Sequence, residues 1–199
     1  MKKFELTNEF ITNMFGTKLF RIRALVEFGD VEAGELGGYV EKESNLGHDD
    51  NAWVYDNAWV YGNARVYGDA QVSGDALVCG NARVYGNARV CGDALVCGNA
   101  RVCSDALVCG NARVCSDEDY AYAHGFGSVN RTTTFFRLKD GGVGVRCGCF
   151  YGTLAQFRDK IRETHGETKK AQEYLMLADL MELRFEEDEN EVGNRKYVE

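Results

Sequence analysis

Three histidines are the first candidates for acid–base chemistry in this chain. His48 precedes a long repetitive stretch, His124 follows it, and His165 stands beside Gly166 at the expected end of a helix. A general base has to reach the proton that it removes at hydrogen-bond distance. His165 suits the negative end of a helix dipole, so we take His48 as the first candidate base and His124 as the second.

Eight cysteines could support metal or disulfide chemistry. Cys147 and Cys149 point to one side of an expected strand, but they lack nearby Cys or His at ligand spacing, so we predict no metal site. The other six share one position of a repeat, and they are Cys79, Cys91, Cys97, Cys103, Cys109 and Cys115. On stacked strands their β-carbons would lie near the strand spacing, which exceeds the ~3.8 Å that a disulfide prefers. We therefore expect these six to be reduced packing residues.

Arginine and asparagine could bind anions where they recur at a fixed spacing. Two series step by eighteen residues, and their members are Arg65, Arg83, Arg101, Asn63, Asn81 and Asn99. If coils stack these arginines, their forked donors suit a phosphate, a nucleotide or an acidic protein surface. Unit charges about 5 Å apart repel by roughly 0.8 kcal/mol in water, a cost that Asp69 and Asp105 at the next corner can offset. The alternatives are a solvated arginine face and a structural ladder of Asn amides.

The spacing follows from a repeat of six residues that runs from Asn51 to Ser116. In each copy Ala and Val lie two residues apart, as do Ala64 and Val66, so both point to one face of a strand. Gly followed by Asn or Asp then tolerates a tight turn. One strand cannot bury these small residues alone, but stacked coils make one continuous narrow core.

A run with this pattern resembles the hexapeptide-repeat left-handed parallel β-helix. The resemblance implies that three six-residue sides close one coil, so residues eighteen apart stack in columns. It also implies the left hand, since ordinary crossovers between parallel strands are right-handed. We classify the chain as mainly β: a left-handed parallel β-helix with an N-terminal β cap and a C-terminal β-hairpin plus two-helix domain.

Many proteins of this hexapeptide superfamily are acyltransferases that bind acyl-CoA between the prisms of a trimer and use a histidine as base. The resemblance therefore implies an alternative function, with acyl-CoA as cofactor and His48 or His124 as base. The chain departs from those enzymes because their longer His-bearing loop and their proline-marked CoA end are missing. We favour no catalytic residue, no cofactor and no metal.

An apolar column could mediate assembly. Trp59, Leu77 and Leu95 recur eighteen residues apart, Tyr61 lies beside Trp59, and Trp53 could extend the surface. Soluble monomers seldom expose such a strip. We therefore expect a homo-oligomer, a dimer or a trimer.

The N-terminal segment is expected to cap the helix, because an open coil end presents unpaired backbone groups. Lys3 to Thr7 can be a strand, and Phe10 to Phe28 reads as a hairpin with its turn near Met14 to Thr17. Gly38 to Val40 looks like a degenerate first side. Glu41 to Asp50 should bulge from a corner.

After the repeat, Tyr120 to Ser128 is expected to continue as one irregular side. Thr132–Leu138 and Val143–Tyr151 surround Lys139-Asp-Gly-Gly142, a hairpin signal. A helix then starts with a capping box between Thr153 and Gln156.

A second helix should run from about Lys169 to Phe185. Its apolar residues cover more than one stripe, so it is expected to be buried on two sides, by the chain and by another subunit. We assign Tyr174, Leu177 and Met181 to that interface.

Further segments carry a closer resemblance. Phe20-Arg-Ile-Arg-Ala-Leu and Leu36-Gly-Gly-Tyr-Val-Glu at the start, with Cys147-Gly-Cys149 and Phe157 through Gly166 at the end, resemble hexapeptide-repeat proteins common in prophages and enteric bacteria. Most of those proteins have no assigned activity. The resemblance implies phage association.

Composition and chain length limit the classes of partner and the cellular location that we expect. The net charge is −8 over 199 residues, with Arg on the repeat and acid at the C-terminus, so a general DNA or RNA binder is not expected. Because no signal peptide or run of eighteen apolar residues is found, we expect a cytoplasmic protein without a membrane partner. We divide the chain into a cap (1–50), the β-helix (51–128), the C-terminal domain (129–186) and an acidic tail (187–199).

These observations favour a non-enzymatic, phage-associated scaffold that oligomerises. It would bind or sequester a host protein or a small anionic ligand, and in doing so inhibit a host defence system. The alternatives are the acyltransferase and a purely structural spacer.

Overall fold

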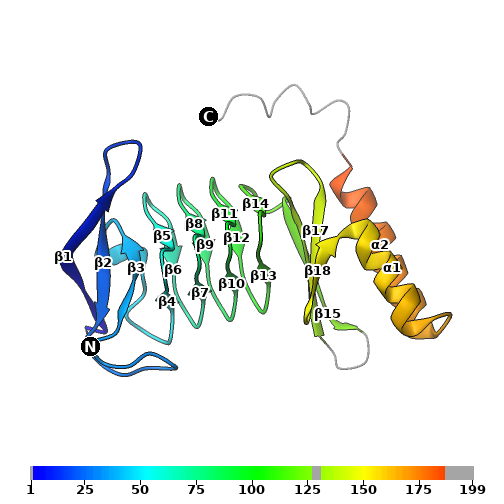
Figure 1. Cartoon of the computed structure of the whole chain (residues 1–199), viewed down its shortest axis with the longest axis horizontal. Coiled ribbons are helices and arrows are strands. Elements are labelled where there is room, and N and C mark those ends of the chain that lie inside the picture. The colour runs from blue at the N-terminus through cyan, green and yellow to red at the C-terminus, as the bar shows by residue number, and fades with distance from the viewer. Residues whose placement is uncertain (1, 127–130, 187–199) are drawn as a thin grey trace.

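The computed structural model describes residues 2–126 and 131–186. The chain is elongated, with a β cap at one end, a β-solenoid in the middle, and a sheet with helices α1 and α2 at the other end (Figure 1). The expected acidic tail (187–199) and the expected boundary at Ser128 lie outside the described residues.

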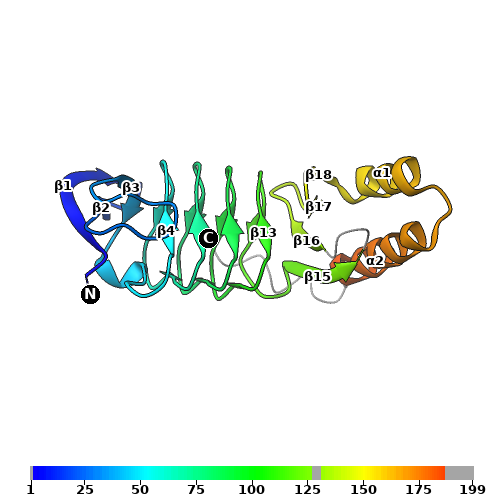
Figure 2. The same cartoon turned by 90° about the horizontal axis from the view of Figure 1, so that it is seen from below.

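The repeat forms a β-solenoid of about four coils within the described residues. Its strands of two residues are β4 (Trp53–Val54), β5 (Trp59–Val60), β6 (Arg65–Val66), β7 (Gln71–Val72), β8 (Leu77–Val78), β9 (Arg83–Val84), β10 (Arg89–Val90), β11 (Leu95–Val96), β12 (Arg101–Val102), β13 (Leu107–Val108) and β14 (Arg113–Val114). They pair in parallel in the orders β5-β8-β11-β14, β13-β10-β7-β4 and β12-β9-β6. Figure 2 shows the coils side by side along the axis.

The solenoid core is narrow because only Ala and Val point inward. Every Ala and Val of the repeat from Ala58 to Val108 is completely buried. Each strand from β4 to β11 pairs with the strand eighteen residues later, as Val60 does with Val78. Ala therefore lies over Ala and Val over Val, as the repeat predicts.

The corners depend on glycine. Gly80 has a φ of 68°, in the left-handed region, and a β-carbon there would lie 3.0 Å from the backbone nitrogen of Gly98 on the next coil. Glycine thus provides both the turn and the close approach of coils.

The cap continues one sheet of the solenoid. Strands β1 (Phe4–Thr12), β2 (Lys18–Ala24) and β3 (Leu36–Val40) are antiparallel, and β3 pairs in parallel with β5. The interpretation of Gly38 to Val40 as a degenerate first side is therefore confirmed.

The expectation that Trp53 extends the apolar outer surface is wrong. It is completely buried, because the cap covers it: the ring of Phe28 lies 5.3 Å away and that of Phe4 6.2 Å away, both edge-on. A large apolar side chain on the first coil thus anchors the cap.

The segment from Glu41 to Asp50, which we expected to bulge from a corner, packs as part of the first coil. It contains the 3₁₀ turn η1 (Glu43–Asn45), and the buried Leu46 forms a parallel bridge with Val66. The Asn45 amide donates to the carbonyl of Ala64 at 2.8 Å. The segment therefore serves as one side of the first coil.

The solenoid ends earlier than we predicted. Residues Tyr120–Phe126 form β15, which pairs antiparallel with β16 (Arg131–Arg137) and so does not continue the coils. The expected hairpin is confirmed as β16 and β17 (Val143–Cys147). The expected second strand, Val143–Tyr151, is wrong beyond Cys147: Gly148 has a φ of 59°, so the chain turns there and Cys149 lies in the turn. Strand β18 (Phe150–Thr153) then returns antiparallel and completes the sheet β15-β16-β17-β18.

Helices α1 (Leu154–His165) and α2 (Lys169–Phe185) pack on this sheet. The capping box is confirmed: the Gln156 N–H donates to the Thr153 hydroxyl at 3.3 Å, and the Thr153 N–H donates to the Gln156 side chain at 2.9 Å. The predicted extent of the second helix is also confirmed.

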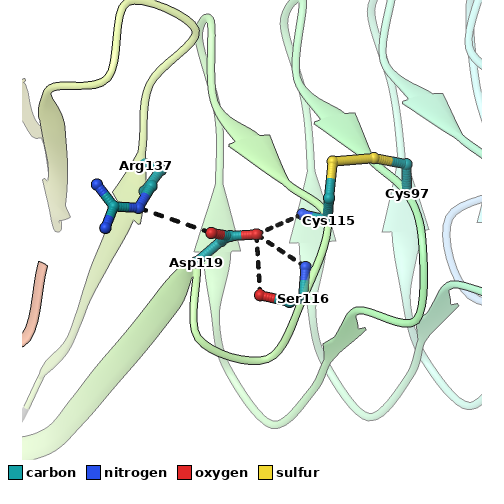
Figure 3. The surroundings of a disulfide bond; sticks show 5 residues. All are labelled: Cys97, Cys115, Ser116, Asp119 and Arg137. Carbon is teal, nitrogen blue, oxygen red and sulfur yellow. Dashed lines mark hydrogen bonds and ion pairs between the residues drawn. A yellow bond between two sulfur atoms is a disulfide. The ribbon is translucent and has the colours of Figure 1, made fainter. Parts of the chain in front are cut away.

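The expectation that all six repeat cysteines are reduced is wrong for Cys97 and Cys115, which form a disulfide (Figure 3). Their Cα atoms lie 4.3 Å apart, closer than the ~4.8 Å between ordinary strands. The neighbouring Gly98 permits this approach, because a β-carbon there would overlap the carbonyl oxygen of Cys115. Uniform strand spacing was therefore the wrong assumption at the last coil.

Asp119 closes the same end of the solenoid (Figure 3). Its carboxylate accepts hydrogen bonds from the backbone N–H groups of Cys115 at 2.9 Å and Ser116 at 2.8 Å. In earlier coils such N–H groups donate to the next coil, as Cys97 does to Val114. Asp119 also lies 3.7 Å from Arg137 of β16, which links the coil end to the C-terminal sheet.

We expect Gly80→Ala to destabilise the solenoid more than Gly16→Ala. Both glycines have positive φ, but a β-carbon at Gly16 meets nothing within 4 Å. Gly16→Ala should cost about 1 kcal/mol from φ alone, and Gly80→Ala should cost more because of the contact with Gly98. Urea unfolding measures both, and equal costs would contradict this account of the corner.

Asp119→Ala should lower the free energy of unfolding by about 1–3 kcal/mol, because it leaves partly buried donors of the last coil unsatisfied. Asp93→Ala is the matched control, since Asp93 is an exposed corner residue of the repeat. It should change stability by less than about 0.5 kcal/mol. If thermal unfolding shows equal effects of the two substitutions, Asp119 does not stabilise the last coil.

Candidate functional site

The arginine column is the candidate binding surface that the structure assembles. Strands β6, β9 and β12 pair in register, with Arg65 opposite Arg83 and Arg83 opposite Arg101. All three residues are exposed. Backbone hydrogen bonds of 2.9 Å, from Arg65 to Ala82 and from Arg83 to Ala100, fix this register.

The carboxylates expected to offset these charges are engaged elsewhere. Asp69 accepts from the Asn51 amide at 2.8 Å, and Asp105 accepts from the Asn87 amide at 3.0 Å. Asp117 accepts from the backbone N–H of Arg101, not from its guanidinium. Within residues 2–126 and 131–186, no side-chain hydrogen bond or ion pair holds the three guanidinium groups. Their donors face solvent.

An amide ladder flanks the arginines on one side. The Asn63 amide donates to Asn81 at 3.2 Å, and the Asn81 amide donates to Asn99 at 3.1 Å. The predicted structural ladder is confirmed. Because these amides bond one another along the axis, they hold a straight edge beside the arginines.

An aromatic ladder flanks them on the other side. Tyr67 and Tyr85 lie two residues after Arg65 and Arg83, and their rings are parallel at 2° with centroids 5.1 Å apart. Cys103 continues this column, and its thiol lies 3.6 Å from the Tyr120 hydroxyl. A hydrogen bond with Cys103 and burial raise the pKa of Tyr85, so this phenol stays neutral at pH 7.

The candidate bases lie at opposite ends of the molecule. His48 stacks on Phe4 with ring centroids 4.4 Å apart, and its Nδ1 accepts from the Lys3 backbone N–H at 3.2 Å. Its Nε2 faces Glu43 at 4.0 Å. His48 thus takes part in the structure of the cap.

His124 and His165 belong to the C-terminal part. His124 is exposed on β15 and its Nδ1 lies 2.9 Å from the Thr132 hydroxyl. His165 ends α1 and stacks on Tyr174 at 6.0 Å. The structure brings none of the histidines to the arginine column.

The apolar column is assembled as expected but is only partly exposed. Trp59 pairs with Leu77, and Leu77 pairs with Leu95. Each is half-buried. Burial and a hydrogen bond with Cys79 raise the pKa of Tyr61, the next residue of this face, to about 12.

The residues of α2 that we assigned to a subunit interface lie in or against the core of the C-terminal domain. Tyr174 and Met181 are 6% and 7% exposed, because they pack in the core between the helices and the C-terminal sheet. Leu177 is half-buried against that core. The outward stripe of α2 is instead Met176, Leu180 and Leu183.

A shallow groove of about 290 Å³, which the sequence did not predict, lies between the cap and the solenoid. Its lining residues are Gly29, Asp30, Asn51, Tyr55, Asp69, Gln71, Asn87 and Arg89. The repeat spacing predicts that Gln71 and Arg89 share a column. The cap residues that line the groove, Gly29 and Asp30, belong to no repeat, so the sequence did not place them there. The lining contains no histidine.

Among the described residues, no three His, Cys, Asp or Glu side chains come close enough to hold a metal ion. Cys147 accepts a hydrogen bond from the Thr133 hydroxyl at 3.2 Å, and Cys149 is exposed. No described helix has the length and apolar character needed to cross a bilayer.

A protein-family model described as a YdcK beta-solenoid repeat matches part of the chain. It matches in overlapping copies at residues 58–74, 70–86, 76–92 and 82–98. No curated protein matches the chain. The matched residues include Arg65, Arg83, Asn63, Asn81, Tyr67 and Tyr85, and the match ends before Asn99 and Arg101. Together with the stacked register, the match supports a β-solenoid repeat fold for this chain.

Proposed function

We propose that this chain is a non-enzymatic binding protein that holds an acidic partner on the column of Arg65, Arg83 and Arg101. The observation that carries the proposal is that the three arginines stand in register and that, within residues 2–126 and 131–186, no acidic side chain pairs with their guanidinium groups. Each exposed guanidinium keeps its donors available for a carboxylate or phosphate.

The flanking columns favour an extended partner over a compact one. Tyr67 and Tyr85 offer ring faces along the same axis, and the amides of Asn63 and Asn81 are already bonded to their neighbours. The surface therefore repeats one pattern at the strand spacing of about 4.8 Å. A strand or loop with several carboxylates can match successive arginines.

The wider context of the proposal rests on resemblance. We propose a left-handed coil of the hexapeptide superfamily, a cytoplasmic location, and a phage protein that sequesters a host protein or a small anionic ligand to inhibit a host defence system. The opening and closing segments that resemble prophage proteins support this context.

The acyltransferase alternative requires a histidine beside an acyl-CoA groove. His48 is engaged by Phe4 and Lys3 in the cap, and the groove beside the cap is lined without histidine. Acetyl-CoA titration distinguishes the alternatives, because a saturable rise in melting temperature would favour the enzyme.

We also propose that copies of the chain associate through the apolar column of Trp59, Leu77 and Leu95. The column is straight and lies on one sheet, so two copies can pack it face to face. The competing surface is the outward stripe of Met176 and Leu180 on α2.

Replacement of Arg65, Arg83 and Arg101 by Gln should weaken binding of a fluorescein-labelled decaglutamate peptide at least tenfold. Each charge-assisted contact contributes about 1 kcal/mol or less at an exposed site, and wild-type binding should weaken with salt. Fluorescence anisotropy at low ionic strength measures the affinity.

The control replaces Arg113, Arg162 and Lys169 by Gln, which removes the same charge elsewhere on the surface. It should bind as the wild type does. If the control loses as much affinity, net charge and not the column attracts the peptide; if the wild type does not bind, the proposal fails.

Leu77→Glu with Leu95→Glu should reduce the molar mass in light scattering to that of one chain, since four carboxylates would face one another in a symmetric dimer. Met176→Glu with Leu180→Glu should leave the oligomer intact. The reverse pattern would place the interface on α2, and a wild type of monomer mass would exclude assembly. Circular dichroism checks that both variants fold.

A further inference from the structure

The cysteines of the solenoid stand in different surroundings although they share one repeat position. Cys97 is bonded to Cys115, whereas Cys91 and Cys109 are free thiols one coil apart. Strands β10 and β13, which precede them, pair in the same parallel register as β11 and β14. The backbone N–H of Cys91 donates to Val108 at 3.0 Å. The free pair therefore shares the strand register of the bonded pair, while its coils keep the ordinary spacing: a β-carbon at Gly92 would lie 3.0 Å from the nitrogen of Gly110. A bond between Cys91 and Cys109 thus requires these two coils to approach as the last coil does at Gly98.

We propose that Cys91 and Cys109 form a redox-active dithiol that a hydroperoxide converts into a second disulfide between coils. Cys91 is half-buried and can meet a small oxidant, whereas Cys109 is buried. Cys91 is thus the thiol that reacts first, and Cys109 is the thiol that resolves it.

Two arginines favour the reactive form of Cys91. Arg89 precedes it by two residues on the same outward side of the coil, and the charge of Arg146, on β17, acts on the pair. The Arg146 Nε is buried without a hydrogen-bond partner among the described residues, so its charge is not shared with a carboxylate there. A cation beside a thiol stabilises the thiolate, which is the nucleophile.

The groups around the pair act in opposite directions. The hydrogen bond with Cys109 and the charges of Arg146 and Arg89 lower the pKa of Cys91 to about 7, against the effect of burial. The same hydrogen bond and burial raise the pKa of Cys109. On the other side of Cys91 the column continues with Ser73, which has no titratable group near pH 7. Tyr151 packs over Gly110, next to Cys109.

The reaction balances with hydrogen peroxide as the oxidant. The Cys91 thiolate attacks one peroxide oxygen, so that an S–O bond forms, the O–O bond breaks, and hydroxide leaves and takes up a proton. The sulfur is oxidised by two electrons and the peroxide is reduced to water. Cys109 then attacks the sulfenic sulfur, the S–S bond forms, and the S–O bond breaks. Hydroxide leaves with the thiol proton of Cys109 as a second water.

Cys103 is the internal control for this pair. It follows β12 at the same repeat position and is half-buried. The residue before it in its column is Tyr85, so no thiol stands on the preceding coil. Overall opening of the solenoid would expose Cys103 as much as Cys91, whereas the proposal requires that Cys91 and Cys109 react with peroxide and that Cys103 does not.

Disulfide mapping of the full-length protein tests the proposal. Trypsin leaves the cysteines on distinct fragments: 66–83 with Cys79, 90–101 with Cys91 and Cys97, 102–113 with Cys103 and Cys109, and 114–131 with Cys115. Before peroxide, after blocking free thiols, 90–101 should be joined to 114–131. After peroxide, 102–113 should join the same complex, and Cys103→Ser should not prevent this.

Further variants identify the order of events. In Cys109→Ser, dimedone should label Cys91 as a sulfenic acid, and Cys109→Ala serves the same purpose if the serine variant unfolds. Arg146→Gln should slow alkylation of Cys91 by iodoacetamide several-fold at pH 7, relative to Cys103 in the same molecule, with a smaller difference at pH 9.

Three outcomes would overturn the proposal. The first is that fragment 102–113 stays separate after peroxide. The second is that it joins through Cys103, so that Cys103→Ser removes the link. The third is that Cys91 joins fragment 66–83 through Cys79 instead. Peptide fragment ions distinguish the cysteines within each fragment.

Discussion

The structure depends on the backbone hydrogen bonds that join each coil to the next over a core of Ala and Val. Trp59 donates to Ala76 and Tyr61 donates to Val78, and the pattern repeats along the solenoid. Larger inward side chains would push these coils apart, so the small core and the hydrogen bonds require each other. The eighteen-residue register that results turns every outward position into a column.

The backbone hydrogen bonds between coils stop at the two ends of the solenoid, and each end satisfies its unpaired backbone groups in a different way. At the start, β3 takes the place of a coil strand, and the cap covers Trp53 with Phe4 and Phe28. At the finish, the Asp119 carboxylate accepts the donors that another coil would have accepted. Both ends satisfy backbone groups that an open coil would leave unpaired.

The columns differ in whether their side chains bond one another. Asn63, Asn81 and Asn99 form a hydrogen-bonded ladder that stabilises the coil. The arginines cannot bond one another because guanidinium groups have donors only, so stacking leaves these donors unpaired within the described residues. The cysteine columns are intermediate, since a stacked thiol can stay free or bond to the next one.

The sequence by itself determined the solenoid, its small core, the columns and both C-terminal helices, because their signals are local or strictly periodic. Tertiary structure decided the burial of Trp53 and Tyr174, the assignment of Tyr120–Phe126 to the last sheet, the groove beside Asp30, and the bond between Cys97 and Cys115. These features depend on segments without a period, which meet the repeat only after folding. The repeat specifies which residues share a column. The N-terminal cap and the C-terminal domain determine which parts of a column are covered by other residues.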